Sequence, residues 1–287
     1  MEECSMTIQW FPGHMAKAKR EVEEKLKLVD FVIELVDARA PLSSQNPLIH
    51  QVLNQKTKMM ILMKRDLADP EMTEKWLQYF QSNEVAAVAL DVNNRKDLQK
   101  AVEMAKEIGN EKLERMRRKG VRPRPARAMI IGIPNVGKST LINRMANKKI
   151  AKTGDRPGVT KQQQWIKIKK DFELMDTPGI LWPKFEDQVV GYRLAAIGTI
   201  KDEILALDDI AAYVIHFLKE KYPNVLHERY KLDESSEEDM WEVFQQIGRQ
   251  RGCLESGGKV NMTKTADVIL QDLRSGKLGR ITLEKPS

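Results

Sequence analysis

The sequence contains no apolar run that approaches the roughly 18 residues needed to cross a membrane. It has only two cysteines, Cys4 and Cys253, and no cysteine and histidine grouping with the spacing of a metal site. Residues 1–5 are acidic and lack the basic-then-apolar layout of a secretion signal. These absences argue against a membrane partner, a disulfide framework and a zinc module. We therefore expect a reducing compartment, and a cytoplasmic location is the simplest.

The composition is that of a folded protein with a basic bias. The 287 residues are 41% hydrophobic and 31% charged, which suits one large domain or two smaller ones. The net charge of +7 suits a polyanionic partner, although a modest excess of lysine is also ordinary solvation. Residues 112–127 carry eight Lys or Arg and one acid, and they are interpreted either as a solvated linker or as an anion-binding segment.

Short apolar segments predict six strands, several of them continuous rather than alternating, as in strands buried on both faces. The predicted strands are 31–36, 59–62, 85–90, 129–133, 165–168 and 172–175. Helical patterns lie between many of them, at 72–80, 97–119 and 139–147. This alternation predicts a parallel sheet with helices on both sides.

After residue 189 the strand signals fade and amphipathic helices are predicted at 205–222, 237–250 and 263–274. We therefore predict an α/β domain over residues 1–183, with a basic N-terminal segment. A smaller, mostly α-helical domain follows over residues 184–287.

The stretch GIPNVGKS, residues 132–139, matches the phosphate-loop pattern G-x-x-x-x-G-K-[ST]. It follows a predicted strand and opens a predicted helix, which is the context that gives the match its meaning. The helix N-terminus and loop amides favour a phosphate. Lys138 is expected to reach the β- and γ-phosphates, and the hydroxyl of Ser139 to hold Mg²⁺.

Two further motifs follow in the order usual for GTPases. Asp176-Thr-Pro-Gly179 ends a predicted strand and is similar to D-x-x-G, in which the Asp supports Mg²⁺ and the Gly amide meets the γ-phosphate. Thr160 ends the stretch DRPGVT and is the kind of loop threonine that closes over Mg²⁺. Ile180 stands where Ras-like enzymes carry the glutamine that orients the attacking water, so another group must do so or turnover will be slow.

The base-reading motifs are displaced to the front of the chain. Residues 63–66, Met-Lys-Arg-Asp, resemble Asn-Lys-x-Asp with Met63 in place of Asn, and Asp91-Val92-Asn93 follows the next predicted strand. Loss of the Asn removes one supporting hydrogen bond, about 1 kcal/mol or up to tenfold in affinity. We predict weaker GTP binding with guanine preference retained through Asp66. The alternative is a site that no longer discriminates bases.

The motif order is that of a circular permutation. All five loops lie outside the strand ends at the same edge of such a sheet, so moving the termini changes the connections but not the site. On these motifs the chain resembles the circularly permuted GTPases, and among them the bacterial ribosome biogenesis GTPase A family. The stretches that carry the resemblance are IQWFPGHMAKAKRE (8–21), ELVDARAPLSSQNP (34–47), GIPNVGKSTLIN (132–143), KTGDRPGVTKQQQW (152–165) and DTPGILWPKFED (176–187).

The resemblance implies GTP or GDP as ligand, with Mg²⁺ and K⁺ as cofactors. The GTP-binding set would be Met63, Lys64, Arg65, Asp66, Asp91, Val92, Asn135, Val136, Gly137, Lys138, Ser139, Thr140 and Gly179. His14 and Lys138 would be catalytic, and Ser139, Thr160 and Asp176 would serve Mg²⁺. Asn135 would coordinate K⁺. The alternatives are that His14 is a surface histidine and that Asn135 simply suits a tight loop.

The resemblance also implies a role: hydrolysis of GTP at a late step of large (50S) ribosomal subunit assembly, stimulated by the ribosome. The partners would be the subunit precursor, its rRNA and ribosomal proteins, and not DNA. Two basic groups would form the RNA-facing surface unless they are plain solvation. They are Lys17, Lys19, Arg20, Lys25 and Lys27, and Arg249, Arg251, Lys259, Lys264, Arg274, Lys277 and Arg280. The alternatives are a GTP-controlled RNA-binding module with incidental hydrolysis, and a GTPase that regulates a protein target.

Overall fold

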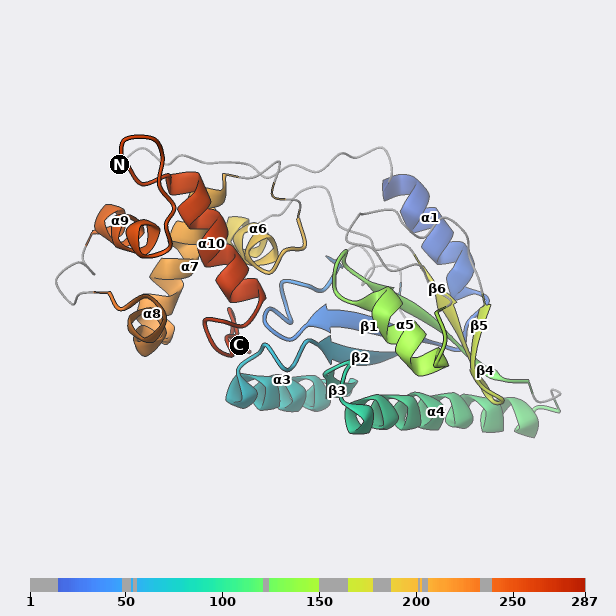
Figure 1. Cartoon of the computed structure of the whole chain (residues 1–287). Helices are drawn as coiled ribbons and strands as arrows, with labels where there is room; N and C mark the ends of the chain where they lie inside the picture. Colours follow the sequence, from blue (N-terminus) through green and yellow to red (C-terminus); the bar gives the residue numbers. More distant parts are fainter. Residues whose placement is uncertain are drawn as a thin grey trace.

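The computed structural model describes residues 15–47, 53, 56–120, 124–149, 165–177, 187–200, 202, 206–232 and 239–286. Within them lies a six-stranded sheet with the strand order β3-β2-β1-β4-β6-β5 (Figure 1). The strands are β1 (Phe31–Asp37), β2 (Thr57–Met63), β3 (Ala86–Leu90), β4 (Ala126–Gly132), β5 (Trp165–Lys169) and β6 (Phe172–Asp176). All six predicted strands are confirmed.

Five strands are parallel, and β5 pairs with β6 in the antiparallel sense. The expectation of a parallel sheet is therefore wrong at this edge. The reason is the connection, because only residues 170 and 171 separate β5 from β6. A parallel pair needs a crossover of a dozen or more residues, whereas two residues suffice for a hairpin.

Helices cover both faces of the sheet. Alternate side chains of β1 point to opposite faces: Phe31 and Leu35 share a buried cluster with α4 (Arg95–Arg118) and α5 (Lys138–Ala146). Val32 packs with α1 (Met15–Leu26), and Val36 with α3 (Pro70–Ser82), on the other face. Every residue of β1 is buried, Glu34 and Asp37 included, which explains why its apolar residues do not alternate with polar ones.

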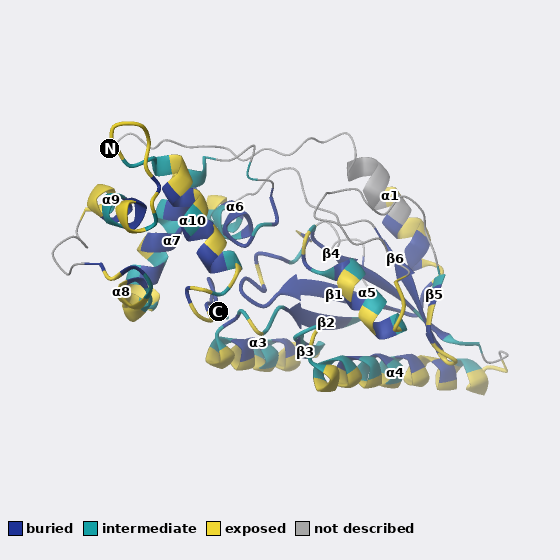
Figure 2. Cartoon of the chain, viewed as in Figure 1, coloured by how far each residue is buried: buried dark blue, intermediate teal, exposed yellow. Residues whose placement is uncertain are grey.

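The remaining helices gather beyond the end of the sheet to which the arrows of β1 and β2 point (Figure 1). They are α6 (Gln188–Ala196), α7 (Leu207–Lys221), α8 (Pro223–Tyr230), α9 (Met240–Gln250) and α10 (Met262–Arg274). They bury their apolar stripes against one another and expose polar faces (Figure 2). The sequence predicted α7, α9 and α10 but not α6 and α8. No helix in the described ranges is both long and apolar enough to cross a membrane.

The basic segment 112–127 is structured at both ends. Its first half completes α4, which ends at Arg118. In its second half Arg124 pairs with Asp30 at 2.8 Å, and Arg127 pairs with Glu173 at 3.2 Å. The linker interpretation is therefore wrong for the described parts: the first half is helical, with its basic side chains exposed, and Arg124 and Arg127 are paired within the fold.

Candidate nucleotide-binding site

The sheet topology brings the predicted loops to one edge. From β1 the chain continues outward to β2 and β3, and from β4 it continues in the opposite direction to β6 and β5. The point where the order reverses, between β1 and β4, is where open α/β sheets bind ligands. The phosphate loop, residues 132–139, follows β4 at this point. The base-reading loops follow β2 and β3, earlier in the chain, as the permuted order requires.

The phosphate loop has the backbone of an anion site. Asn135 and Gly137 have φ angles of 60° and 102°, in the left-handed region that favours glycine. Gly137 is the N-cap of α5, and no side chain caps the helix there. The first amides of a helix have no intrahelical partner, so those of α5 are free to meet a phosphate.

Lys138 and Asp176 meet behind these amides as a buried pair. Lys138 Nζ lies 3.4 Å from Asp176 Oδ1, and both side chains are less than a tenth exposed. Burial lowers the pKa of Lys138, and the Asp176 carboxylate partly opposes this shift. Asp176 Oδ1 accepts no hydrogen bond from the described part of the chain. A buried carboxylate oxygen of this kind suits a hard cation such as Mg²⁺, and its partner Lys138 is followed directly by Ser139, whose hydroxyl is a second oxygen ligand of the kind Mg²⁺ takes.

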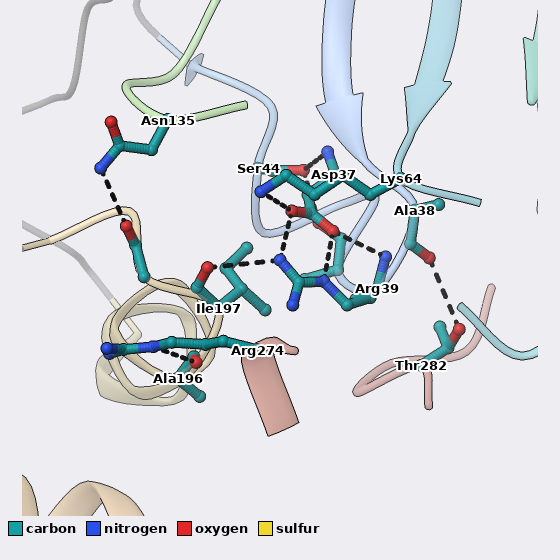
Figure 3. Close-up of polar contacts among 12 residues, drawn as sticks. Asp37, Ala38, Arg39, Ser44, Lys64, Asn135, Ala196, Ile197, Arg274 and Thr282 are labelled. Carbon is teal, nitrogen blue, oxygen red and sulfur yellow. Dashed lines mark hydrogen bonds and ion pairs between the residues drawn. The ribbon is translucent and has the colours of Figure 1, made fainter. Parts of the chain in front are cut away.

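The base loop, residues 63–69, connects β2 to α3. Its Lys64 has a φ of 59°, and its ammonium lies 3.0 Å from Asp37 Oδ2. Arg39 binds the same carboxylate through Nε at 2.9 Å and Nη2 at 2.8 Å (Figure 3). Burial would raise the pKa of Asp37, but the charges of Arg39 and Lys64 and the hydrogen bonds from Arg39 hold it well below its usual range. Lys64 is thus fixed by an ionised anchor.

Met63 lies in the core with no exposed surface. A Cβ added to Gly137 would lie 3.1 Å from Met63 Cε, so the methionine methyl packs against the phosphate loop. In most GTPases the Asn at this position ties the base loop to the phosphate loop by hydrogen bonding. Here an apolar contact joins the same two loops.

The two base-reading loops are joined by Asp97 in the first turn of α4. Its carboxylate lies 2.6 Å from Arg65 Nε and accepts a hydrogen bond from the Asp91 amide at 2.9 Å. Val92, which follows Asp91 and is also expected to contact GTP, packs against the main hydrophobic core. Sequence reasoning missed Asp97. The available signal was its place three residues after Asn94, whose side chain caps α4.

The carbonyl end of α6, residues 195–198, receives donors from three parts of the chain (Figure 3). Asn135 Nδ2 donates to Gly198 O at 3.0 Å, and Arg39 Nη2 donates to Ile197 O at 3.3 Å. Arg274, at the end of α10, donates to the carbonyls of residues 195 and 196 at 2.8 and 3.1 Å. The last carbonyls of a helix lack intrahelical partners and favour cations. This helix end therefore joins the phosphate loop to the C-terminal helices.

Four bases expected on an RNA-facing surface have partners inside the protein. Arg274 also pairs with Asp202, and Arg251 donates to the main chain of α8. Arg280 donates to two carbonyls of the base loop, and Lys25 is only 3% exposed. These contacts tie the four side chains into the fold, with Arg280 itself exposed, and their contact with RNA remains a prediction. The other described bases of the C-terminal set are exposed: Arg249, Lys259, Lys264 and Lys277.

Three predicted site residues lie outside the described residues: His14, Thr160 and Gly179. Their roles remain predictions.

Comparison with known proteins agrees with this geometry. A family profile described as "50S ribosome-binding GTPase" matches residues 127–246. "Ribosome biogenesis GTPase A" of Bacillus pumilus is 56% identical over 281 residues, which cover 98% of this chain and 99% of its own length. The protein of the same name from Thermotoga maritima is 28% identical and covers 97% of this chain and 95% of its own length.

A solved structure gives the same answer for the fold. GNP-bound YlqF from T. maritima matches with a TM-score of 0.66 at 24% identity, covering 94% of this chain and 99% of that chain. At this identity the match speaks for the fold alone, and the sequence relatives speak for the family. With more than half of its residues identical to a relative of matching length, the chain belongs to the ribosome biogenesis GTPase A family.

Proposed function

We propose that this protein hydrolyses GTP as an assembly factor at a late step of large (50S) ribosomal subunit maturation, and that the subunit stimulates it. One observation carries the proposal. Phosphate loop, base loop and Asp176 lie at one sheet edge in permuted order, in a chain similar over nearly its full length to proteins named Ribosome biogenesis GTPase A.

Guanine selection falls to Asp66. Its carboxylate can accept two hydrogen bonds from the N1 and N2 groups of guanine, which adenine cannot match. Asp66 is exposed, and Lys64 beside it is held by Asp37, so its aliphatic stem is available to the face of the base. The second loop, at Asp91 and Val92, supports the base through its bridge to Asp97.

The phosphates would be bound by the main-chain amides of the phosphate loop and of the first turn of α5, and by the Lys138 ammonium. Ser139 and Asp176 would hold Mg²⁺, which when bound neutralises charge on the phosphate oxygens. The buried carboxylate of Asp176 partly offsets the lowering of the Lys138 pKa by burial. Thr160 would close over Mg²⁺, and the Gly179 amide would contact the γ-phosphate.

Asn135 would take K⁺ through its Oδ1. The hydrogen bond to Gly198 uses Nδ2, the donor end of the amide, and does not occupy the oxygen. This bond orients the side chain from the α6 end. The role of His14 is proposed from the sequence. This histidine would orient the attacking water in place of the glutamine that Ile180 replaces.

The exposed bases of the C-terminal helices would meet rRNA phosphates, with ribosomal proteins as further partners. Phosphate contacts release counterions, so binding should weaken steeply as salt rises. A factor that acts on ribosomal precursors would work in the cytoplasm.

The proposal is tested by capture of large-subunit precursors from a lysate with tagged protein and a non-hydrolysable GTP analogue, with and without RNase. RNase should release the protein, whereas retention would favour regulation of a protein target. His14→Ala should bind precursors and GTP normally but turn over slowly. If cells with only His14→Ala assemble large subunits at the normal rate, hydrolysis is incidental and the RNA-binding module is correct.

A further inference from the structure

The chain returns to the sheet at its end. After α10, residues 280–284, here called the C-terminal tail, run between the base loop and the loop that follows β1. Four of the five tail residues are at least 93% buried: Ile281, Thr282, Leu283 and Glu284. Figure 1 places the C-terminus between the C-terminal helices and the start of α3.

Glu284 anchors the tail to the loop that follows β1. Its carboxylate accepts hydrogen bonds from the amides of Leu42 and Ser43 and from the Ser43 hydroxyl, and it pairs with Arg193 at 3.1 Å. The Leu283 amide donates to Arg39 O at 2.7 Å. A buried carboxylate with this many donors is fully satisfied, which makes the anchor firm.

The other end of the tail holds the base loop through its main chain. Arg280 donates to the carbonyls of Arg65 and Ala68, both at 2.8 Å. The Ile281 amide donates to Leu67 O at 3.0 Å. The residue between these held carbonyls is Asp66, whose own side chain remains exposed.

Asp69, the last residue of the base loop and the N-cap of α3, is held by the same neighbours. Its amide donates to Thr282 Oγ1 at 3.1 Å. Tyr222, at the end of α7, donates its hydroxyl to Asp69 Oδ2 at 3.0 Å. Burial, together with the Asp69 carboxylate, raises the pKa of Tyr222 to about 12.

From these contacts we propose that the C-terminal tail is a positioning element for guanine recognition. By fixing the carbonyls on either side of Asp66, the tail holds that carboxylate in place for the base. Connecting loops are mobile unless they are tied, and in this chain the usual Asn tie is replaced by Met63. The inference rests on the proposed role of Asp66. Because coupling is reciprocal, guanine nucleotides in turn stabilise the docked tail.

The test compares the double variant Arg280→Met with Thr282→Val against Lys285→Met. The double variant and Lys285→Met each remove one positive charge, but Lys285 is exposed and lies outside the tail, directly after Glu284. Equilibrium affinity for fluorescent GDP and competition by unlabelled GDP and ADP are measured well below the unfolding midpoint of each protein. The double variant loses three hydrogen bonds to the base loop, none of them to the nucleotide itself, so it should bind GDP only about three- to tenfold more weakly, the effect of about one direct hydrogen bond. Its ADP affinity should be unchanged, and Lys285→Met should match the parent.

An unchanged GDP affinity and GDP-to-ADP ratio in the double variant would overturn the inference, even if its unfolding midpoint falls. Should the double variant not fold, Arg280→Met alone gives the same test, because Arg280 lies at the surface. Arg280→Lys should recover part of the affinity. The inference also requires that GDP slows hydrogen exchange of the Ile281 and Leu283 amides in the parent protein, and no slowing would contradict it.

Asp66→Ala separates the two levels of the argument. Loss of guanine preference in Asp66→Ala but not in the double variant refutes the tail inference and leaves the base assignment standing. Retention of guanine preference in Asp66→Ala refutes the base assignment, and the inference with it.

Discussion

Asn135 of the phosphate loop donates a hydrogen bond from its side-chain amide to the main-chain carbonyl of Gly198, at 3.0 Å. Gly198 lies two residues after the last residue of α6, so one bond joins the phosphate loop to the C-terminal helices. The base loop reaches the same helix end by another path, because Lys64 pairs with Asp37, and Arg39 links Asp37 to Ile197 O (Figure 3). The phosphate loop therefore contacts the end of α6 directly, and the base loop is linked to it through Asp37 and Arg39.

Replacing Asn135 with Ala should remove the stimulation of GTP turnover by K⁺ over Na⁺, because Oδ1 is lost. The variant should also lose about 0.5–1.5 kcal/mol of unfolding free energy with the bond to Gly198. Turnover in matched K⁺ and Na⁺ buffers and urea unfolding measure the two effects. Full K⁺ stimulation in Asn135→Ala would show that this residue does not serve the cation.

Replacing Asp37 with Asn should lower the unfolding free energy by about 3–5 kcal/mol at neutral pH, since it leaves the buried Arg39 without its charge partner. The pKa of Asp37 is held well below its usual range, so the stabilisation is present above the unfolded value of about 3.9 and is lost as pH falls towards the folded value. The parent should therefore lose stability below about pH 4 more steeply than Asp37→Asn. Urea unfolding across acid pH measures this. Parallel curves would contradict the assigned ionisation.

The local sequence predicted most of the frame of the molecule. Each of the six strands is a short apolar segment, and the phosphate loop has a spacing that few other structures require. The permuted order could be inferred as well, because the phosphate loop, the two base-reading loops and Asp176 each come at the end of a strand. The sequence did not predict α6 and α8, because they are short helices whose stability depends on packing against their neighbours.

The supports of the site could not be predicted in the same way. The bond from Arg280 to Arg65 O joins residues 215 positions apart, and Arg274 looked like any other exposed base at a helix end. Hydrogen bonds to main-chain carbonyls place no constraint on the residue type of their acceptors. A sequence therefore shows which residues can bind a nucleotide but not which residues hold them in place.

Met63→Ala should lower the unfolding free energy by about 2–5 kcal/mol, as large-to-small changes in cores do, and should weaken GDP binding as well. The reason for the second effect is the lost contact with Gly137. The matched control is Met60→Ala, equally buried in β2 but packed on the opposite face. It should cost similar stability and leave GDP affinity unchanged. Equal effects of both variants on affinity would show that the Met63 contact has no special role.

Arg274→Met should destabilise the protein by about 1.5–3 kcal/mol, the range for hydrogen bonds to charged groups, because the α6 carbonyls and Asp202 lose their donor. Lys264→Met, on the exposed face of the same helix, should change stability by less than about 0.5 kcal/mol. Thermal and urea unfolding of both variants decide the matter. Equal, small effects would mean that Arg274 is available for RNA after all.

The most direct test of the central claim is GTP turnover in K⁺ buffer with and without purified large ribosomal subunits. We expect strong stimulation by the subunits, in spite of Met63 and Ile180, and little stimulation of His14→Ala. If GTP binding is confirmed and the subunits leave turnover unchanged, the claim of a ribosome-stimulated assembly GTPase is contradicted.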